Sequence, residues 1–198
     1  AGVPYVPVST SYTAVEAAFS KLQAVFEKTR PRFIWSDCYA DQEHALATAG
    51  ITAASVIWLG SRDNKQSTPL ATTVSPAGES RVKVRAASLG RDTIARYMFT
   101  SGSTGSPKGV IHTHGMVGAM LAARAALGED EPEAEPPRFL DWMPWSHVGA
   151  GVLRLAFVVQ AGGAVYIDDG KPIPGEFEKT LANIKVVRPT AYAGAPLG

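Results

Sequence analysis

Apolar residues recur along this chain with two different periods, which predict helices and strands in alternation. Apolar side chains at spacings of three and four predict a helix over residues 12–29. A second helix is expected over residues 41–49, because Asp41 is a good N-cap and Gly50 a good helix stop. The strands expected in this part are a short buried run at residues 32–35 and a second run at residues 53–59.

The rest of the chain continues the alternation after a long interruption. Residues 60–80 are rich in Ser, Thr, Pro and Gly without periodicity, which is typical of a surface connection. Residues 129–135 carry five acidic side chains and are expected to form a solvated loop. The alternation predicts an α/β fold with a largely parallel sheet flanked by helices. The expected strands are residues 95–100, 139–143, 164–167 and 190–193, and the expected helices are residues 115–127, 148–159 and 174–187.

Composition narrows the classes of partner. An apolar fraction of 45% is typical of a soluble fold with a substantial core, and a net charge of +1 offers no concentrated positive field for nucleic acid. The single cysteine, Cys38, excludes an internal disulfide and fits a reducing cytoplasm. No apolar run approaches the roughly 20 residues that a membrane span needs. Small-molecule or protein partners are therefore expected.

The strongest chemical signal is the run YMFTSGSTGSPKGV at residues 97–110. An apolar strand enters a loop with three glycines, four hydroxyl side chains from Ser101 onward and one lysine, Lys108. Glycines let backbone N–H groups approach an anion, hydroxyls donate hydrogen bonds and the ammonium group neutralises charge. A Walker A loop is excluded because Pro107 precedes the lysine and Gly109 follows it. The pattern predicts a polyphosphate site, and its place between the strand that ends at Thr100 and the apolar pair Val110-Ile111 argues against a flexible linker.

This run resembles the signature loop of adenylate-forming enzymes, which include acyl-CoA synthetases, luciferases and peptide-synthetase adenylation domains. The resemblance implies that the loop holds the β- and γ-phosphates of ATP, with Thr100 near a Mg²⁺ ion and Lys108 as a catalytic residue. The residues that it implies for nucleotide binding are Thr100, Ser101, Gly102, Ser103, Thr104, Gly105, Lys108 and Gly109.

A second signal is the run DWMPWSHVGAG at residues 141–151. It resembles the next motif of the same family, in which an aromatic residue and a histidine border the carboxylate-binding pocket. The resemblance implies that His147 orients the acid for attack on the α-phosphate, as a second catalytic residue. It implies a substrate pocket formed by Trp145, His147 and Gly149. Judged alone, a histidine near two tryptophans is more often a core residue, and Trp142 and Trp145 fit either core or pocket wall.

Longer stretches are similar to feruloyl-CoA synthetases, whose substrates are hydroxycinnamates. They are residues 89–97, 140–147 and the run DDGKPIP at residues 168–174. In this branch a polar residue and then an aromatic one usually follow the histidine, whereas here Val148 and Gly149 stand. Smaller side chains suggest a reshaped pocket, so a long-chain acid stays an alternative to an aryl acid. The resemblance implies ATP, Mg²⁺ and CoA as cofactors.

The extent of the resemblance leads us to expect that residues 1–198 are an internal fragment of a large N-terminal adenylation domain. The remainder of that domain and a small C-terminal domain would be missing, so the isolated piece is expected to be inactive. Strand edges left unpaired would favour self-association. Two other classes stay open, namely a nucleotide- or pyrophosphate-binding module without catalysis and a remnant that binds nothing.

Overall fold

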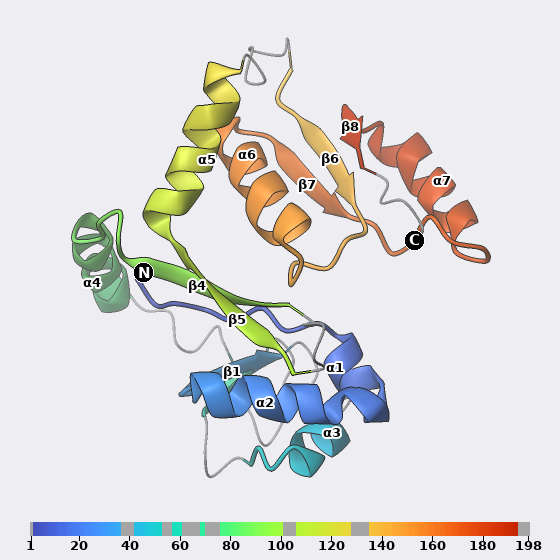
Figure 1. The fold of residues 1–198 in the computed structure, drawn as a ribbon. Coiled ribbons are helices and arrows are strands. Elements are labelled where there is room, and N and C mark those ends of the chain that lie inside the picture. Colours follow the sequence, from blue (N-terminus) through green and yellow to red (C-terminus); the bar gives the residue numbers. More distant parts are fainter. Residues whose placement is uncertain are drawn as a thin grey trace. The chain divides into compact units, whose positions relative to one another are not determined.

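The computed structural model of the chain describes residues 2–36, 42–52, 57–60, 68–69, 76–100, 106–127 and 135–193. The chain divides into two compact units, Ala1–His112 and Thr113–Gly198. Both have helices and strands in alternation, so the predicted α/β class is confirmed. The two units are described one after the other (Figure 1).

The first unit begins with a broken helical segment. Helix α1 (Ser11–Ala14) ends where Val15 becomes extended, a 3₁₀ turn η1 (Glu16–Ala18) follows, and α2 (Phe19–Thr29) is the first long helix. The prediction of one continuous helix over residues 12–29 is therefore wrong at its start. Helix α2 ends at Arg30, whose φ of 42° is left-handed and whose N–H donates to the Phe26 carbonyl at 2.7 Å. Pro31 cannot continue the helix, because it lacks an N–H.

A small parallel sheet follows, with strand order β1-β2-β3. It consists of β1 (Phe33–Ser36), β2 (Ile57–Gly60) and β3 (Thr68–Pro69), with Phe33 opposite Ile57. The strands predicted near residues 32–35 and 53–59 are confirmed, although residues 53–56 lie outside the described part. The description of the first strand as buried is wrong, since Phe33 is 49% and Trp35 59% exposed.

Helix α3 (Glu43–Thr48) packs with α2 to form the core of the first unit. Its expected N-cap, Asp41, lies outside the described residues, and Gln42 in the cap position makes no side-chain cap bond. The predicted stop is confirmed, because Gly50 adopts a φ of +71° just after the helix. The buried cluster consists of Phe19, Leu22, Ala45, Leu46, Ala49 and Ile51.

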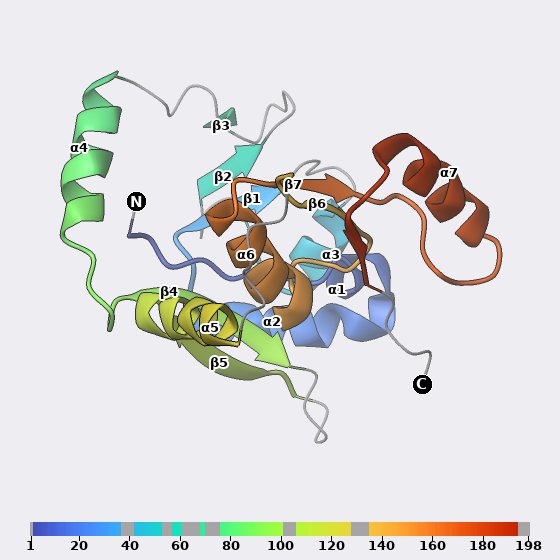
Figure 2. The same ribbon diagram turned by 90° about the horizontal axis from the view of Figure 1, so that it is seen from above.

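The predicted surface connection over residues 60–80 contains regular structure, which corrects the prediction. Strand β3 falls inside it, and helix α4 (Pro76–Ala87) begins inside it with a proline. The helix has no apolar stripe for a periodicity argument to detect. Lys83 and Glu79, one turn apart, form an exposed ion pair at 2.8 Å. Figure 2 shows α4 standing apart from α2 and α3.

Strands β4 (Ile94–Thr100) and β5 (Lys108–Thr113) pair in a two-stranded sheet. The predicted strand at residues 95–100 is confirmed, whereas β5 was not predicted, because residues 108–113 were assigned to the end of the loop and the stretch before the helix expected from residue 115. The segment around Tyr5 runs beside β4 in parallel. The Tyr5 N–H donates to the Ala95 carbonyl at 3.3 Å, and the Tyr97 N–H donates to the Tyr5 carbonyl at 3.0 Å.

The second unit is built on a parallel sheet with strand order β7-β6-β8. The strands are β6 (Arg138–Asp141), β7 (Ala164–Ile167) and β8 (Ala191–Tyr192), and each matches a predicted strand. Asp141 pairs with Ile167 and Leu140 with Tyr192. Because the strands are parallel, their carboxyl ends meet at one edge of the sheet.

Two helices, α6 (Leu155–Gln160) and α7 (Phe177–Val187), pack against this sheet. Helix α5 (His114–Ala126) and the π-helical stretch η3 (Gly149–Arg154) pack against α6. In both views α6 lies on one side of β6 and β7, whereas α7 lies on the other (Figures 1 and 2). The side chain of Thr113 caps α5 by accepting from the Met116 N–H at 3.2 Å. The predicted helix at residues 148–159 is confirmed in extent, but its first turns are π-helical.

None of the helices within the described ranges is long and apolar enough to cross a membrane.

Candidate functional site

The predicted phosphate loop joins the two strands of the β4–β5 pair. Thr100 is the exposed last residue of β4, and Lys108 is the exposed first residue of β5. The five residues between Thr100 and Ser106, which are Ser101, Gly102, Ser103, Thr104 and Gly105, lie outside the described residues. Pairing of the two strands brings the two ends of the loop together, so that a hydroxyl and an ammonium group flank it.

A lysine far away in sequence holds the end of this loop. Lys28, in the last turn of α2, donates from Nζ to the Pro107 carbonyl at 2.6 Å. Pro107 is one of the most deeply buried residues, whereas its neighbour Lys108 is exposed. The contact joins residues 79 positions apart. No sequence signal pointed to Lys28, because a lysine near a helix C-terminus is common on solvated surfaces.

Gly109 has a packing role that its predicted part in nucleotide binding does not require. A Cβ on this residue would lie 3.3 Å from Cζ of Phe99, on the neighbouring strand β4. The absence of a side chain lets β5 approach the Phe99 ring closely. A side chain at this position would require the Phe99 ring to shift by a few tenths of an ångström.

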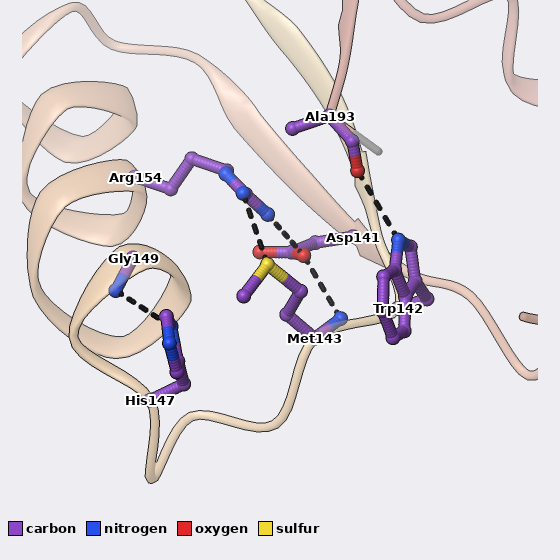
Figure 3. A network of polar contacts seen from close by, with 7 residues as sticks. All are labelled: Asp141, Trp142, Met143, His147, Gly149, Arg154 and Ala193. Carbon is purple, nitrogen blue, oxygen red and sulfur yellow. Dashed lines mark hydrogen bonds and ion pairs between the residues drawn. The ribbon is translucent and has the colours of Figure 1, made fainter. Parts of the chain in front are cut away.

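His147 lies on the turn that follows β6, and hydrogen bonds of its own backbone shape that turn. Its N–H donates to the Pro144 carbonyl at 2.9 Å, and its carbonyl accepts from the Gly151 N–H at 2.9 Å. The ring is exposed, and its Nδ1 accepts a hydrogen bond from the Gly149 N–H at 3.1 Å (Figure 3). An acceptor nitrogen carries no proton, so a neutral His147 bears its proton on Nε2. The residue therefore presents a hydrogen-bond donor.

The two glycines after His147 make this arrangement possible. A Cβ on Gly149 would lie 3.2 Å from the His147 Nδ1, so the bare backbone lets its N–H reach the ring. A Cβ on Gly151 would come within 2.0 Å of the Trp145 carbonyl oxygen. The turn is closed so tightly that Gly151 admits no side chain.

The structure separates the roles of the two tryptophans, which the sequence left open. The indole Nε1 of Trp142 donates to the Ala193 carbonyl at 3.1 Å, which ties the end of β6 to the end of β8. Trp145 is 47% exposed. Trp142 is thus a structural residue, and Trp145 presents an aromatic surface that a ligand can contact.

An ion pair missed by the sequence reasoning spans the same turn. Asp141, only 3% exposed, accepts hydrogen bonds from the Met143 N–H at 3.0 Å and from Nη1 of Arg154. Figure 3 shows the carboxylate between these two donors. The signal available in the sequence was an aspartate within the strand expected over residues 139–143, a position where burial of a charge requires a partner.

A second buried aspartate lies at the same edge of the sheet. The Asp168 N–H donates to the Asp141 carbonyl at 2.9 Å. Its carboxylate oxygen Oδ1 accepts from Asn183 at 2.7 Å and from the Gly170 N–H at 2.9 Å. Burial by itself would raise the pKa of Asp168, but these hydrogen bonds lower it below its ordinary value. Burial raises the pKa of Tyr192, and the negative charges of Asp168 and Asp141 raise it further.

Metal binding by protein side chains alone finds no support in the described part of the chain. No group of three or more His, Cys, Asp or Glu residues lies close enough there to hold an ion. The Thr100 hydroxyl offers one oxygen ligand, and Mg²⁺ is commonly held by few protein ligands together with substrate phosphates. The residues thus fit an ion that arrives with a nucleotide.

Alternating helices and strands with parallel pairing in both units define a chain of the α/β class. Residues 1–197 match the family described as AMP-binding enzyme. The chain therefore belongs to the AMP-binding enzyme family, whose members form adenylates.

Sequence relatives in this family are much longer than the chain. A long-chain-fatty-acid–CoA ligase of Gallus gallus is 33% identical over 100 residues, which are 50% of this chain and 13% of the ligase. The carboxylic acid reductase of Mycobacterium tuberculosis is 35% identical over 105 residues, which are 53% of this chain and 8% of the reductase.

Solved structures agree with the fold. The structure of McyG A-PCP complexed with phenylalanyl-adenylate superimposes with a TM-score of 0.60 and 23% identity, over 94% of this chain and 27% of that one. At this identity the likeness shows the fold alone. It identifies the described elements as part of an adenylation domain fold.

Proposed function

We propose that this chain is part of the large N-terminal domain of an acid–thiol ligase that activates a carboxylic acid with ATP and transfers it to CoA. The observation that carries the proposal is the loop of residues 100–109, flanked by Thr100 and Lys108, in a chain that matches the AMP-binding family over residues 1–197. A cytoplasmic location is part of the proposal.

The loop is assigned to the phosphates of ATP. The ammonium group of Lys108 would contact the β- and γ-phosphate oxygens, and the amides and hydroxyls of residues 101–105 would complete the cradle. The Thr100 hydroxyl would hold a Mg²⁺ ion that arrives with ATP, and such an ion would offset phosphate charge. The contact between Lys28 and the Pro107 carbonyl supports this assignment, because it fixes the backbone directly before Lys108.

His147 is assigned to the acid. Its Nε2–H can donate to one carboxylate oxygen while the other attacks the α-phosphorus. A P–O bond forms to the carboxylate and the P–O bond to pyrophosphate breaks, giving an acyl-adenylate. The CoA thiolate then forms a C–S bond as AMP leaves, and the thiol proton passes to solvent. Trp145 and Gly149 would border the acyl group.

Two classes of acid are supported by different observations. The runs at residues 140–147 and 168–174 favour an aryl acid of the hydroxycinnamate type. The match to a long-chain-fatty-acid–CoA ligase and the small residues after His147 favour a long-chain acid. A panel of both acid types, assayed for thioester formation by the full-length protein, would decide between them. Aldehyde formed with a reductant would instead point to a carboxylic acid reductase.

The decisive experiment is ATP–pyrophosphate exchange by the full-length protein with Lys108→Met. Exchange should fall by about a hundredfold, because one charge-assisted contact to the transferring phosphates is lost. The matched control is Lys171→Met, since Lys171 is a half-exposed lysine paired only loosely with Glu176 at 3.7 Å. Equal exchange in both variants would refute the assignment of the loop.

The isolated chain of residues 1–198 should bind ATP without completing the reaction. Thioester formation by this chain with ATP, acid and CoA would contradict the expectation. Nucleotide binding by a full-length protein that exchanges no pyrophosphate with any acid would favour the alternative, a binding module without catalysis.

A further inference from the structure

The turn that carries His147 is clamped where it begins and where the following helix ends. It begins after Asp141, the last residue of β6, and η3 ends at Arg154. The Asp141 carboxylate accepts from the Met143 N–H at 3.0 Å and from Nη1 of Arg154. One carboxylate thus binds the first part of the turn and the helix that follows it (Figure 3).

The pair is buried, although both of its members are charged. The side chain of Asp141 is 1% exposed and that of Arg154 is 14% exposed. Nη2 of Arg154 donates to the Met143 sulfur at 3.3 Å. The Cζ atom of Arg154 lies 5.9 Å from the Phe139 ring centroid. Within the described part of the chain, Oδ2 of Asp141 has no hydrogen-bond partner. The buried carboxylate therefore depends on Arg154 for its compensating charge.

The winding of η3 gives the clamp its geometry. A π-helical stretch is wider than an α-helix, and such stretches are frequent at functional sites. Inside the clamp, Gly151 packs against the Trp145 carbonyl and its N–H bonds to the His147 carbonyl. The positions of His147 and of the Gly149 N–H that fixes its ring are thus set by a turn held between Asp141 and Arg154.

We propose that Asp141 and Arg154 are a positioning pair for His147. By closing the turn, the pair keeps the Gly149 N–H on Nδ1 and so holds the proton of the neutral ring on Nε2, where a substrate carboxylate can accept it. This role rests on the proposed function of His147 in acid binding. Neither residue of the pair needs to touch the substrate.

The test uses variants that separate charge from shape. Arg154→Gln removes the cation, Arg154→Lys keeps it, and the double variant Asp141→Asn with Arg154→Gln removes both charges while leaving polar groups in place. The control is Glu135→Gln, which breaks an exposed ion pair at 2.8 Å to Arg138, the first residue of the strand that ends at Asp141. If Arg154→Gln does not fold, the lysine and double variants carry the test.

The first readout is the tautomer of His147, measured by long-range ¹H–¹⁵N correlation spectra of the chain with His147→Ala as the assignment control among four histidines. The wild type and Glu135→Gln should show the Nε2–H tautomer. The double variant should show a mixture of tautomers, and Arg154→Lys should retain most of the wild-type pattern. An unchanged tautomer in a folded double variant would overturn the proposal.

The second readout is the kinetics of adenylation by the full-length protein. The double variant should lose about tenfold or more in kcat/KM for the acid, as expected when a positioning contact is lost, with KM for ATP within twofold of wild type. A loss that appears only in thermal stability would also overturn the proposal. If His147→Ala leaves acid kinetics unchanged, the proposed function of His147 fails, whereas the tautomer spectra still decide the positioning role.

Discussion

Single side chains in the second unit show how closely the backbone constrains the candidate site. A Cβ on Gly151 would lie 2.0 Å from the Trp145 carbonyl oxygen, whereas a Cβ on Gly118, in the middle of α5, would face open space. The sequence predicts a helix over residues 148–159, which contains both Gly149 and Gly151, and the resemblance implies a role only for Gly149, in the substrate pocket. The structure shows that Gly151 is required for close packing, a distinction that depends on tertiary contacts and is absent from the sequence.

Alanine substitutions at these two glycines should have opposite effects. Gly151→Ala should lower the free energy of unfolding by roughly 2–4 kcal/mol, because the new methyl group overlaps a carbonyl oxygen. Gly118→Ala should raise it by about 0.5–1 kcal/mol, because it removes backbone freedom from the unfolded chain without a clash. Urea denaturation followed by circular dichroism would measure both. Equal effects of the two changes would contradict the packing described for Gly151.

Asp168 should make the stability of the second unit depend on pH. Its pKa is lowered in the folded state, so its contribution is present above the unfolded value of about 3.9 and is lost as the pH falls through the lower, folded value. The difference in unfolding free energy between the wild type and Asp168→Asn should therefore be larger at neutral pH than in acid below that range. Denaturation curves of both proteins across pH would show it. If this difference in unfolding free energy did not change with pH, the hydrogen bonds of Asp168 would not favour its charged form over its neutral form.

At the scale of helices and strands, the elements that the sequence predicts well are those with an apolar side. Strands β4, β6 and β7 and helix α5 lie within one or two residues of their expected positions. Helix α4 was missed because its charged sequence has no apolar stripe, and β5 because its glycine and lysine suggested a loop. The hydrogen bond from Lys28 to the Pro107 carbonyl could not be predicted, since it depends on how α2 packs beside Pro107.

The contact between α2 and the loop should be measurable by hydrogen exchange. Lys28→Met should cost about 1 kcal/mol in unfolding free energy and speed amide exchange at residues 106–111, because the Pro107 carbonyl loses its donor. Lys83→Met is the control, since the Lys83–Glu79 pair is exposed and should contribute only about 0.3 kcal/mol. Slow exchange at residues 106–111 in Lys28→Met would argue that other contacts hold the loop end.

For the whole molecule, alternation of elements was enough to predict the α/β class and parallel pairing. It was not enough to predict two compact units, because the division depends on which elements pack together. Within the described part of the first unit, β1 is an edge strand that exposes Phe33 and Trp35. An exposed edge with large apolar side chains favours pairing with a second copy.

The isolated chain should therefore self-associate as its concentration rises. Replacing Phe33 and Trp35 together by lysine should shift the sedimentation profile toward the monomer, because charge on an edge strand opposes pairing. Val186→Lys is the control, since Val186 is 83% exposed but lies on helix α7. A monomeric wild type at all concentrations, or an equal shift in the control, would exclude the β1 edge as the contact.

The same helix-to-strand connection, a left-handed arginine followed by a proline, occurs in both units and limits where the chain can bend. Helices α2 and α7 each end at a left-handed arginine, Arg30 and Arg188, which is followed by proline, one further residue and the first residue of a parallel strand. Proline fixes φ and offers no N–H, so each junction has few alternative conformations. We therefore expect each of these helices to move together with the strand that follows it, and bending of the chain to occur at positions other than these two junctions.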